Sequence, residues 1–253
     1  MTSEPEWWTP DQLTATEEQV RVSLRDTMPD IRNDYGSYGA LAEGADPVTS
    51  GLYLHNEFES WRVATLCTDY LHLMARASGE TPARIADLGC GAGFTTVGLK
   101  QQWPNAQVVG FELSHDAVAY ARRRWSACEF IQGAVRLNKP LIGAPFDLIL
   151  CQEFYPFTRT AAASDHAQWL ELISSNLSAR GVGIVTVSSA TRQCINTTYP
   201  DLHRQLNLQR VHLAAPRLGR RLPHVLSRAA GSLLRIARPK WARSVYLLRK
   251  TTE

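Results

Sequence analysis

The hydrophobic positions along this 253-residue chain change their spacing several times, and each change marks a predicted helix or strand. Between residues 58 and 74, apolar side chains recur at helical spacing until a glycine and a proline end the helix. Short apolar runs then alternate with amphipathic stretches. We expect strands at 83–88, 108–112, 128–132, 146–151, 181–187, 208–213 and 244–248, and helices at 94–102, 114–125 and 165–178.

The alternation of strands and helices predicts a parallel sheet with helices on its faces, because right-handed crossovers place a helix between successive strands. The fold class is therefore α/β, with a Rossmann-like, doubly wound, mostly parallel seven-stranded sheet. We expect an N-terminal arm or helical lid over residues 1–56 and a domain over 57–253. Within that domain, residues 214–243 form a basic helical insertion before the last strand.

The net charge of +3 hides an uneven distribution of charges along the chain. Residues 1–60 hold twelve acids against three arginines, whereas residues 202–253 hold twelve bases against one acid. The basic segment could bind a membrane surface, bind RNA, or pair with the acidic arm. We favour pairing with the arm, because between residues 204 and 238 the side chains with an aromatic ring are only His212 and His224. Proteins that bind nucleic acid more often interleave aromatic residues with basic ones.

Composition excludes several other classes of protein. The N-terminus is acidic and has no secretory signal, and no apolar run approaches the roughly 18 residues of a membrane span. The five cysteines lie too far apart for a zinc knuckle or a disulfide framework. We expect a cytoplasmic protein with reduced thiols and no membrane span. The sequence leaves a homodimer open.

The most informative segment is 87–93, which reads Asp-Leu-Gly-Cys-Gly-Ala-Gly between an expected strand and an expected helix. A dinucleotide fingerprint would have its third glycine where this chain has Phe94, and a P-loop would need Lys-Ser/Thr. Asp87 suits an ammonium group, because a carboxylate there would repel phosphate. Glu112, at the end of the next strand, can accept hydrogen bonds from the hydroxyls of a ribose. A ligand with a ribose, an amino group and no phosphate fits both acids, and together they point to S-adenosylmethionine (SAM).

On these residues the chain resembles the class I SAM-dependent methyltransferases of the small-molecule type, over about residues 57–190. Residues 87–93 match the family's first motif, and 108–112 match its second strand with the ribose-binding acid. The resemblance implies SAM as cofactor and S-adenosylhomocysteine (SAH) as its product. The residues that it implies at the cofactor are Asp87, Gly89, Cys90, Gly91, Gly93, Glu112, Leu113, Gln132, Gly133, Ala134 and Cys151.

The loop after the third strand departs from the family pattern. The family often has an acid there that holds the adenine amine, whereas this chain reads Gln132-Gly133-Ala134. Two alternatives remain: the adenine is held by Gln132, or it is held by the backbone.

The loop after the fourth strand is expected beside the reactive methyl group, because open parallel sheets bind ligands at the carboxyl ends of their strands. Glu153 is the first candidate for a general base or for orienting the acceptor, followed by Tyr155 and His55. Glu153 could equally anchor its neighbours. Candidate residues for binding the acceptor are Tyr35, Tyr38, Phe154 and Phe157. Apolar packing beneath the loop is the alternative for the two phenylalanines.

These features predict an enzyme that transfers a methyl group by in-line displacement to O, N or an activated carbon of a small, secondary-metabolite-like acceptor. The acidic arm favours a neutral or cationic acceptor. The transfer is expected to need no metal, because no His/Asp/Glu cluster has ligand spacing. We expect no nucleic-acid partner. The alternatives are an RNA or protein methyltransferase that uses the basic segment, or a SAM-binding protein without catalysis.

Overall fold

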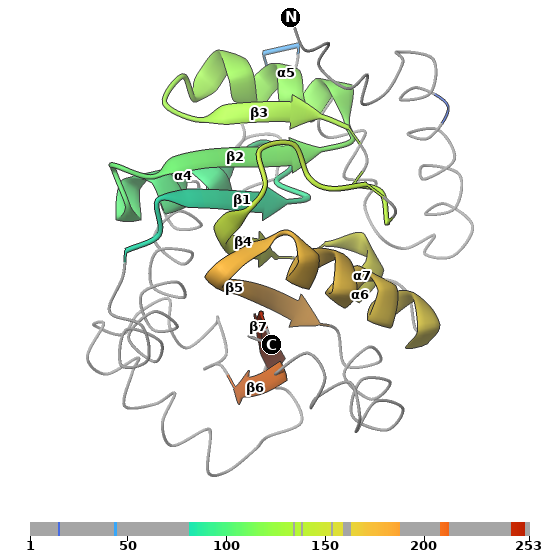
Figure 1. The fold of residues 1–253 in the computed structure, drawn as a ribbon. Coiled ribbons are helices and arrows are strands. Elements are labelled where there is room, and N and C mark those ends of the chain that lie inside the picture. Colours follow the sequence, from blue (N-terminus) through green and yellow to red (C-terminus); the bar gives the residue numbers. More distant parts are fainter. Residues whose placement is uncertain are drawn as a thin grey trace, which may run out of the picture. The chain divides into compact units, whose positions relative to one another are not determined.

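The structure is a computed structural model that describes residues 15, 43–44, 81–133, 135–137, 139–152, 154–158, 163–187, 208–212 and 244–250 (Figure 1). It contains two compact units. The first unit takes the described residues up to 44 and 89–135, and the second takes 81–88 and those from 136 onward. The arm over 1–56 falls outside the described residues apart from three positions, and the insertion over 214–243 falls outside them entirely.

The first unit consists of two parallel strands with a helix packed on each. Strand β2 (Gln107–Glu112) pairs with β3 (Glu129–Gln132), and Glu112 lies opposite Gln132. Helix α4 (Phe94–Gln102) packs on β2, and α5 (His115–Arg124) packs mainly on β3 (Figure 1).

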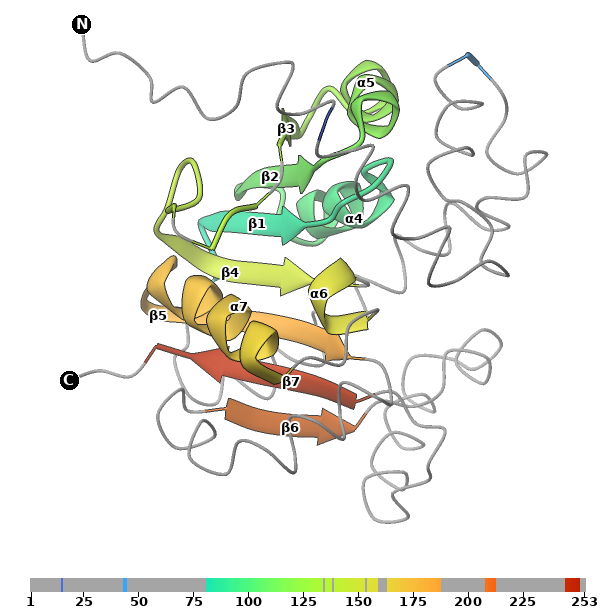
Figure 2. The same cartoon turned by 90° about the vertical axis from the view of Figure 1, so that its right-hand side faces the viewer.

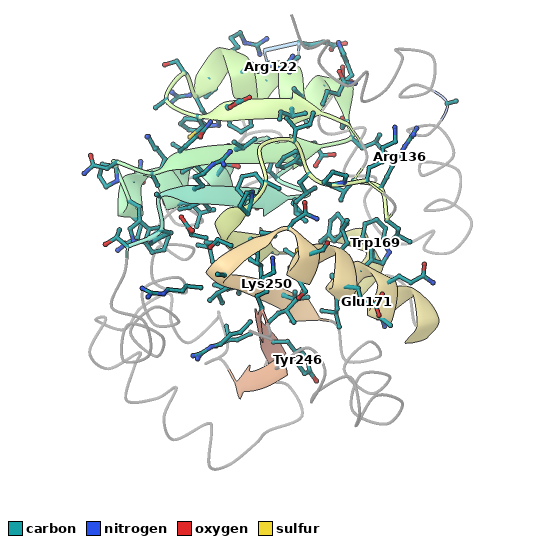
Figure 3. All side chains as sticks on the ribbon, in the orientation of Figure 1. Arg122, Arg136, Trp169, Glu171, Tyr246 and Lys250 are labelled. Atoms are coloured by element: carbon teal, nitrogen blue, oxygen red, sulfur yellow. The ribbon has the colours of Figure 1, made fainter. Side chains whose placement is uncertain are left out.

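Helix α5 shows why this sequence forms a helix at this position. The hydroxyl of Ser114 accepts a hydrogen bond from the Ala117 N–H at 3.3 Å, which satisfies a free donor at the helix start. Asp116 in the first turn and three arginines in the last turn complement the helix dipole. Arg122, labelled in Figure 3, donates from Nε and Nη2 to the Phe130 carbonyl at 3.0 and 2.7 Å. These bonds fasten the end of α5 to β3.

The second unit is a sheet in the order β1-β4-β5-β7-β6. Its strands are β1 (Arg84–Leu88), β4 (Phe146–Cys151), β5 (Leu177–Val187), β6 (Leu208–His212) and β7 (Ser244–Arg249). The pairs β1–β4 and β4–β5 are parallel, and β7 is antiparallel to both of its neighbours. Figure 2 shows β7 pointing against its neighbours β5 and β6, and the short helix α6 (Tyr155–Thr158) beyond the tip of β4. Helix α7 (Ala163–Ser175) packs on β5.

Polar side chains hold the amino ends of the parallel strands in the second unit. Asp147, the second residue of β4, accepts hydrogen bonds from the N–H groups of Ala83 and Arg84 and from the hydroxyl of Ser178. Asn176, only 2% exposed, accepts from Leu141 N–H and donates to the Leu172 carbonyl. The strands β1, β4 and β5 are therefore joined at their amino ends by side chains as well as by the sheet.

The helices and strands predicted within the described residues are present, but the boundary between α7 and β5 is wrong. The helix ends at Ser175 rather than 178, and the strand begins at Leu177 rather than 181. The reason is an irregularity in the register: Leu177 pairs with Phe146, and pairing then resumes between Val182 and Leu148. A Cβ at Gly181 would lie 2.6 Å from the Phe146 carbonyl oxygen, so the irregularity requires glycine there. Helix α6 was not expected.

Candidate functional site

The glycine turn, residues 89–93, connects to the start of α4 in the first unit. Gly89, Gly91 and Gly93 have φ angles of 72, 54 and 84°, which L side chains rarely adopt. The N–H groups of Gly89 and Cys90 both donate to the Phe111 carbonyl, at 2.8 and 3.1 Å. The Gly93 N–H donates to the Cys90 carbonyl at 3.0 Å. The three glycines are thus required by the backbone conformation of the turn.

Glu112 holds the turn through its carboxylate. Oε2 accepts a hydrogen bond from the Gly91 N–H at 2.8 Å, and Oε1 accepts one from the Ser114 N–H at 2.9 Å. The side chain is only 9% exposed. Each carboxylate oxygen can accept about two hydrogen bonds. The two backbone bonds therefore orient the carboxylate at the end of β2.

The side of the turn that faces the body of the first unit is packed with apolar groups. A Cβ on Gly93 would lie 2.7–2.9 Å from the rings of Phe130 and Trp125, and a Cβ on Gly110 would lie 2.7 Å from the sulfur of Cys90. The Cys90 side chain is 7% exposed and packs in a cluster with Phe130. The Cys90 thiol thus belongs to the core of the first unit, and its contribution to a ligand would come from its backbone.

The residues predicted at the adenine lie at the ends of β2 and β3. Gln132 is half-buried beside Glu112 in the register, and the Gly133 N–H donates to the Glu112 carbonyl at 2.9 Å. Leu113 follows Glu112 and is also half-buried. The parallel pair therefore brings Gln132 next to Glu112 at its carboxyl end. Ala134 lies outside the described residues.

In the second unit, two further predicted residues lie at the carboxyl ends of neighbouring strands. Asp87 near the end of β1 is 1% exposed, and Cys151 at the end of β4 is fully buried. Burial raises the pKa of the Cys151 thiol well above its usual value, and the negative charge of Asp87 raises it further. The thiol is therefore protonated at neutral pH and does not act as a nucleophile there.

An aromatic cluster follows β4. The ring of Phe154, half-buried, lies 6.2 Å from that of Phe157 and meets the ring of Trp169 edge-on at 5.4 Å. Phe157 is fully buried and lies 5.9 Å from the ring of His166, itself fully buried on α7. Figure 3 labels Trp169 on α7. Of the two phenylalanines predicted at the acceptor, Phe154 alone has exposed ring surface.

Trp169 and Trp125 were not among the predicted site residues. Trp169 lies three positions after His166, so helical spacing brings both to one side of α7 and could have indicated the cluster. Nothing local to Trp125 indicates its contact with the turn, because the two are 33 positions apart. Glu153, His55, Tyr35 and Tyr38 lie outside the described residues, as does the side chain of Tyr155.

Within the described ranges, no group of three or more His, Cys, Asp or Glu side chains could hold a metal ion. Among those same residues, no helix is long and apolar enough to cross a membrane.

Comparison with known proteins shows that residues 81–221 match the methyltransferase domain family. The chain is 37% identical to trans-aconitate 2-methyltransferase of Escherichia coli (strain K12 / DH10B) over 90 residues, 36% of this chain and 33% of that protein. The enzyme of the same name from Shigella flexneri is 37% identical over 89 residues, 35% of this chain and 33% of its own. The match thus spans about a third of the length of these relatives.

Two solved structures share the fold. The plantazolicin methyltransferase BpumL, in complex with a triazolic desmethylPZN analog and SAH, aligns with a TM-score of 0.54 and 16% identity. That alignment covers 96% of this chain and 100% of BpumL. DesVI from Streptomyces venezuelae aligns with a TM-score of 0.53 and 12% identity, over 82% of this chain and 99% of its own. These similarities confirm the predicted Rossmann-like, mostly parallel fold.

Proposed function

The chain belongs to the methyltransferase domain family, among the class I enzymes that use SAM as cofactor, and we propose that it transfers a methyl group from SAM to a small organic acceptor. The observation that carries the proposal is the glycine turn braced by Glu112. The backbone of the turn has positive φ angles at the three glycines of the first motif. The carboxylate of Glu112 is held by two backbone N–H groups.

The groups at the turn fit SAM. We assign the ribose hydroxyls to Glu112, because its carboxylate is oriented at the end of β2 by the Gly91 and Ser114 N–H groups and can accept hydrogen bonds from hydroxyls. Gly89, Gly91 and Gly93 border the methionyl part, where the lack of side chains lets a ligand approach the backbone. Asp87, two positions before the turn in the chain, receives the amino group. Its negative charge suits an ammonium and disfavours phosphate.

The adenine ring is assigned to the segment from the end of β2 to the end of β3. Gln132 has both donors and acceptors in its amide, and it lies beside Glu112 in the register. Leu113, Gly133, Cys90 through its backbone, and Ala134 complete the assignment. Cys151, protonated and fully buried at the end of β4, supplies packing surface to the cofactor end of that strand.

SAM supplies an electrophilic methyl group when bound, so the protein has to align the acceptor and exclude water. We assign the acceptor to the loop after β4, where the Phe154 ring is held edge-on by Trp169. A half-buried, fixed ring offers a face on which a planar acceptor can stack. Tyr35, Tyr38 and Phe157 remain proposed acceptor residues. Glu153, Tyr155 and His55 remain the proposed proton-handling residues.

A screen of acceptors tests the activity. The full chain is incubated with SAM and separate pools of neutral or cationic small molecules, planar heteroaromatics, trans-aconitate, and RNA or protein, and SAH formation is followed by mass spectrometry. We expect SAH with a small-molecule pool, with equal yield after EDTA treatment. Turnover with RNA or protein alone would overturn the small-molecule proposal, and loss of turnover in EDTA restored by magnesium would overturn metal-independent transfer.

The remaining predictions can be tested on the same protein. The boundary between the arm over 1–56 and the domain over 57–253 is a proposal that rests on sequence. So are the pairing of the acidic arm with the basic segment 202–253, the cytoplasmic location and the homodimer. Raised salt should increase the rate of proteolysis in the arm and the basic segment without abolishing SAH binding, because exposed charges are screened within about 8–10 Å at physiological ionic strength. Cleavage rates that ignore salt would argue against the pairing.

A further inference from the structure

We propose that Trp125 is a positioning residue for the glycine turn, which it holds in the backbone conformation that the cofactor needs. This inference rests on the proposed binding of SAM at the turn. Trp125 is half-buried and is the C-cap of α5, so it belongs to a different element from the turn. Its indole Nε1–H donates to the Ala92 carbonyl at 3.0 Å.

That hydrogen bond completes a set that fixes successive peptide groups of the turn. The peptide between Ala92 and Gly93 is held at its oxygen by Trp125 and at its N–H by the Cys90 carbonyl. The peptide between Cys90 and Gly91 is held at its N–H by Glu112. Glu112 and Trp125 thus fix neighbouring parts of one short segment, one from the end of β2 and the other from the end of α5.

The indole ring also occupies the space that a side chain at Gly93 would need. A Cβ there would lie 2.9 Å from Cδ1 of Trp125. The ring is itself held in place: Phe94 meets it edge-on with centroids 5.4 Å apart, and the guanidinium of Arg124 lies 4.4 Å from its centroid. A ring held by these contacts can hold the glycine turn in place, because rearranging the turn would require moving a packed side chain.

Preorganisation is the physical reason that this contact affects binding. A turn already held in its bound conformation loses little conformational freedom when the ligand arrives. Removing the indole N–H should let the turn sample other conformations in the free protein and weaken cofactor binding. The expected effect is a three- to tenfold weaker affinity for SAH, about what one net hydrogen bond contributes.

The matched control is Trp103, the C-cap of α4 in the same unit. Both tryptophans donate their backbone N–H to the residue four positions earlier, and both carbonyls accept from the residue three positions later. Their backbone angles are also alike, with φ of −127° and −125°. Trp103 is 8% exposed, so replacing it removes a comparable aromatic ring without removing the bond to Ala92.

The experiment compares wild type, Trp125→Phe and Trp103→Phe by SAH titration calorimetry, thermal unfolding and amide hydrogen exchange of the segment 89–94. We expect both variants to lose stability. Weaker SAH binding and faster exchange of the Gly91 and Gly93 amides should appear in Trp125→Phe alone. Trp125→Tyr, which keeps a ring and a hydroxyl donor, replaces the phenylalanine variant if that variant does not fold.

Each of the other possible outcomes would overturn one of the proposals. A wild-type protein that does not bind SAH overturns the proposed function itself. If wild type binds but Trp125→Phe binds equally well, Trp125 does not position the turn. If Trp103→Phe weakens SAH binding and accelerates exchange of the turn as much as Trp125→Phe does, general loss of packing is the explanation and the proposal fails.

Discussion

Glu112 and Asp147 are carboxylates at opposite ends of their strands, and both accept hydrogen bonds from backbone N–H groups. Glu112, at the carboxyl end of β2, accepts from the turn and from the start of α5. Asp147, near the amino end of β4, accepts from the chain entering β1 and from a hydroxyl of β5. Asp147 joins three strands of the second unit, whereas Glu112 shapes a turn that lies beyond its strand in the first.

The contrast is between a carboxylate that fastens strands together and one that the proposed function assigns to the cofactor. At the amino ends, Asp147 and Asn176 accept hydrogen bonds from backbone N–H groups. Asp87 and Cys151, buried at the carboxyl ends of β1 and β4, and the positive-φ glycines are likewise assigned to the cofactor. We therefore expect changes at the two ends to separate stability from cofactor affinity.

The largest effect should come from Gly93→Ala, paired with Gly143→Ala. Both glycines have a φ of 84°, so the backbone strain is shared. At Gly93 the new methyl group would clash with Phe130 and Trp125, whereas at Gly143 its nearest neighbour is the far end of the Arg84 side chain, at 3.2 Å. We expect about 3 kcal/mol less unfolding free energy for Gly93→Ala and about 1 kcal/mol for Gly143→Ala, measured in urea. Only the former should weaken SAH binding, by more than about tenfold. Equal losses would mean that strain alone explains both glycines.

Asp147→Ala should come next and act on stability alone. It leaves the N–H groups of Ala83 and Arg84 without their carboxylate and should lower the unfolding free energy by about 2 kcal/mol. The affinity for SAH, measured by calorimetry on the folded variant, should stay within about twofold of wild type. Asp116→Ala, at a half-exposed carboxylate in the first turn of α5, is the control and should cost about 0.5 kcal/mol. A large fall in affinity with Asp147→Ala would break the proposed separation.

Glu112→Ala should act mainly on cofactor affinity, in contrast to Asp147→Ala. It removes the proposed ribose acceptor and the bond to Gly91, so SAH should bind about tenfold more weakly or worse, equivalent to about 1.4 kcal/mol. Glu129→Ala removes an exposed carboxylate from the amino end of β3 in the same unit and should leave affinity unchanged. Calorimetric titration of both variants provides the measurement. Wild-type affinity in Glu112→Ala would remove this residue from the ribose assignment.

The smallest effect concerns Cys151. Burial and Asp87 raise the pKa of this thiol in the folded state, so the unfolded chain releases the proton at lower pH than the native protein does. Stability from this group is therefore complete below the unfolded pKa and is lost as pH rises towards the folded pKa. Between about pH 8 and pH 9.5, wild type should lose about 1 kcal/mol more than Cys151→Ala. Parallel unfolding curves for the two proteins across this range would show that the thiol titrates normally.

Much of the glycine turn and of the elements that flank it in the chain could be predicted from sequence. The strand, glycine turn and helix around residues 84–102 follow one another directly, and each has a local signal: an apolar run, three glycines at alternate positions, and a helical pattern. Glu112 was also identifiable, because a strand of predictable length places its last residue at the sheet edge that carries the turn.

The errors lie where a contact between distant residues overrides a local pattern. The segment Ser178-Ala179-Arg180-Gly181 has the composition of a turn after a helix, yet it forms the irregular start of β5. Pairing with Phe146 and the bond from Ser178 to Asp147 decide its conformation. The local pattern also does not distinguish Phe157 from Phe154, because contact with His166 on another helix is what buries Phe157.

Within the described residues, the sequence by itself determined the order of helices and strands apart from α6, the positions that need glycine, and the acids that we propose at SAM. These features depend on residues within one element or one turn, whose spacing is visible in the chain. The tertiary structure decided which groups hold that turn: the indole of Trp125 on Ala92, and Phe130 against Gly93. Hydrophobic spacing shows which face of an element is buried but not which distant side chain it meets, because that partner is selected by packing.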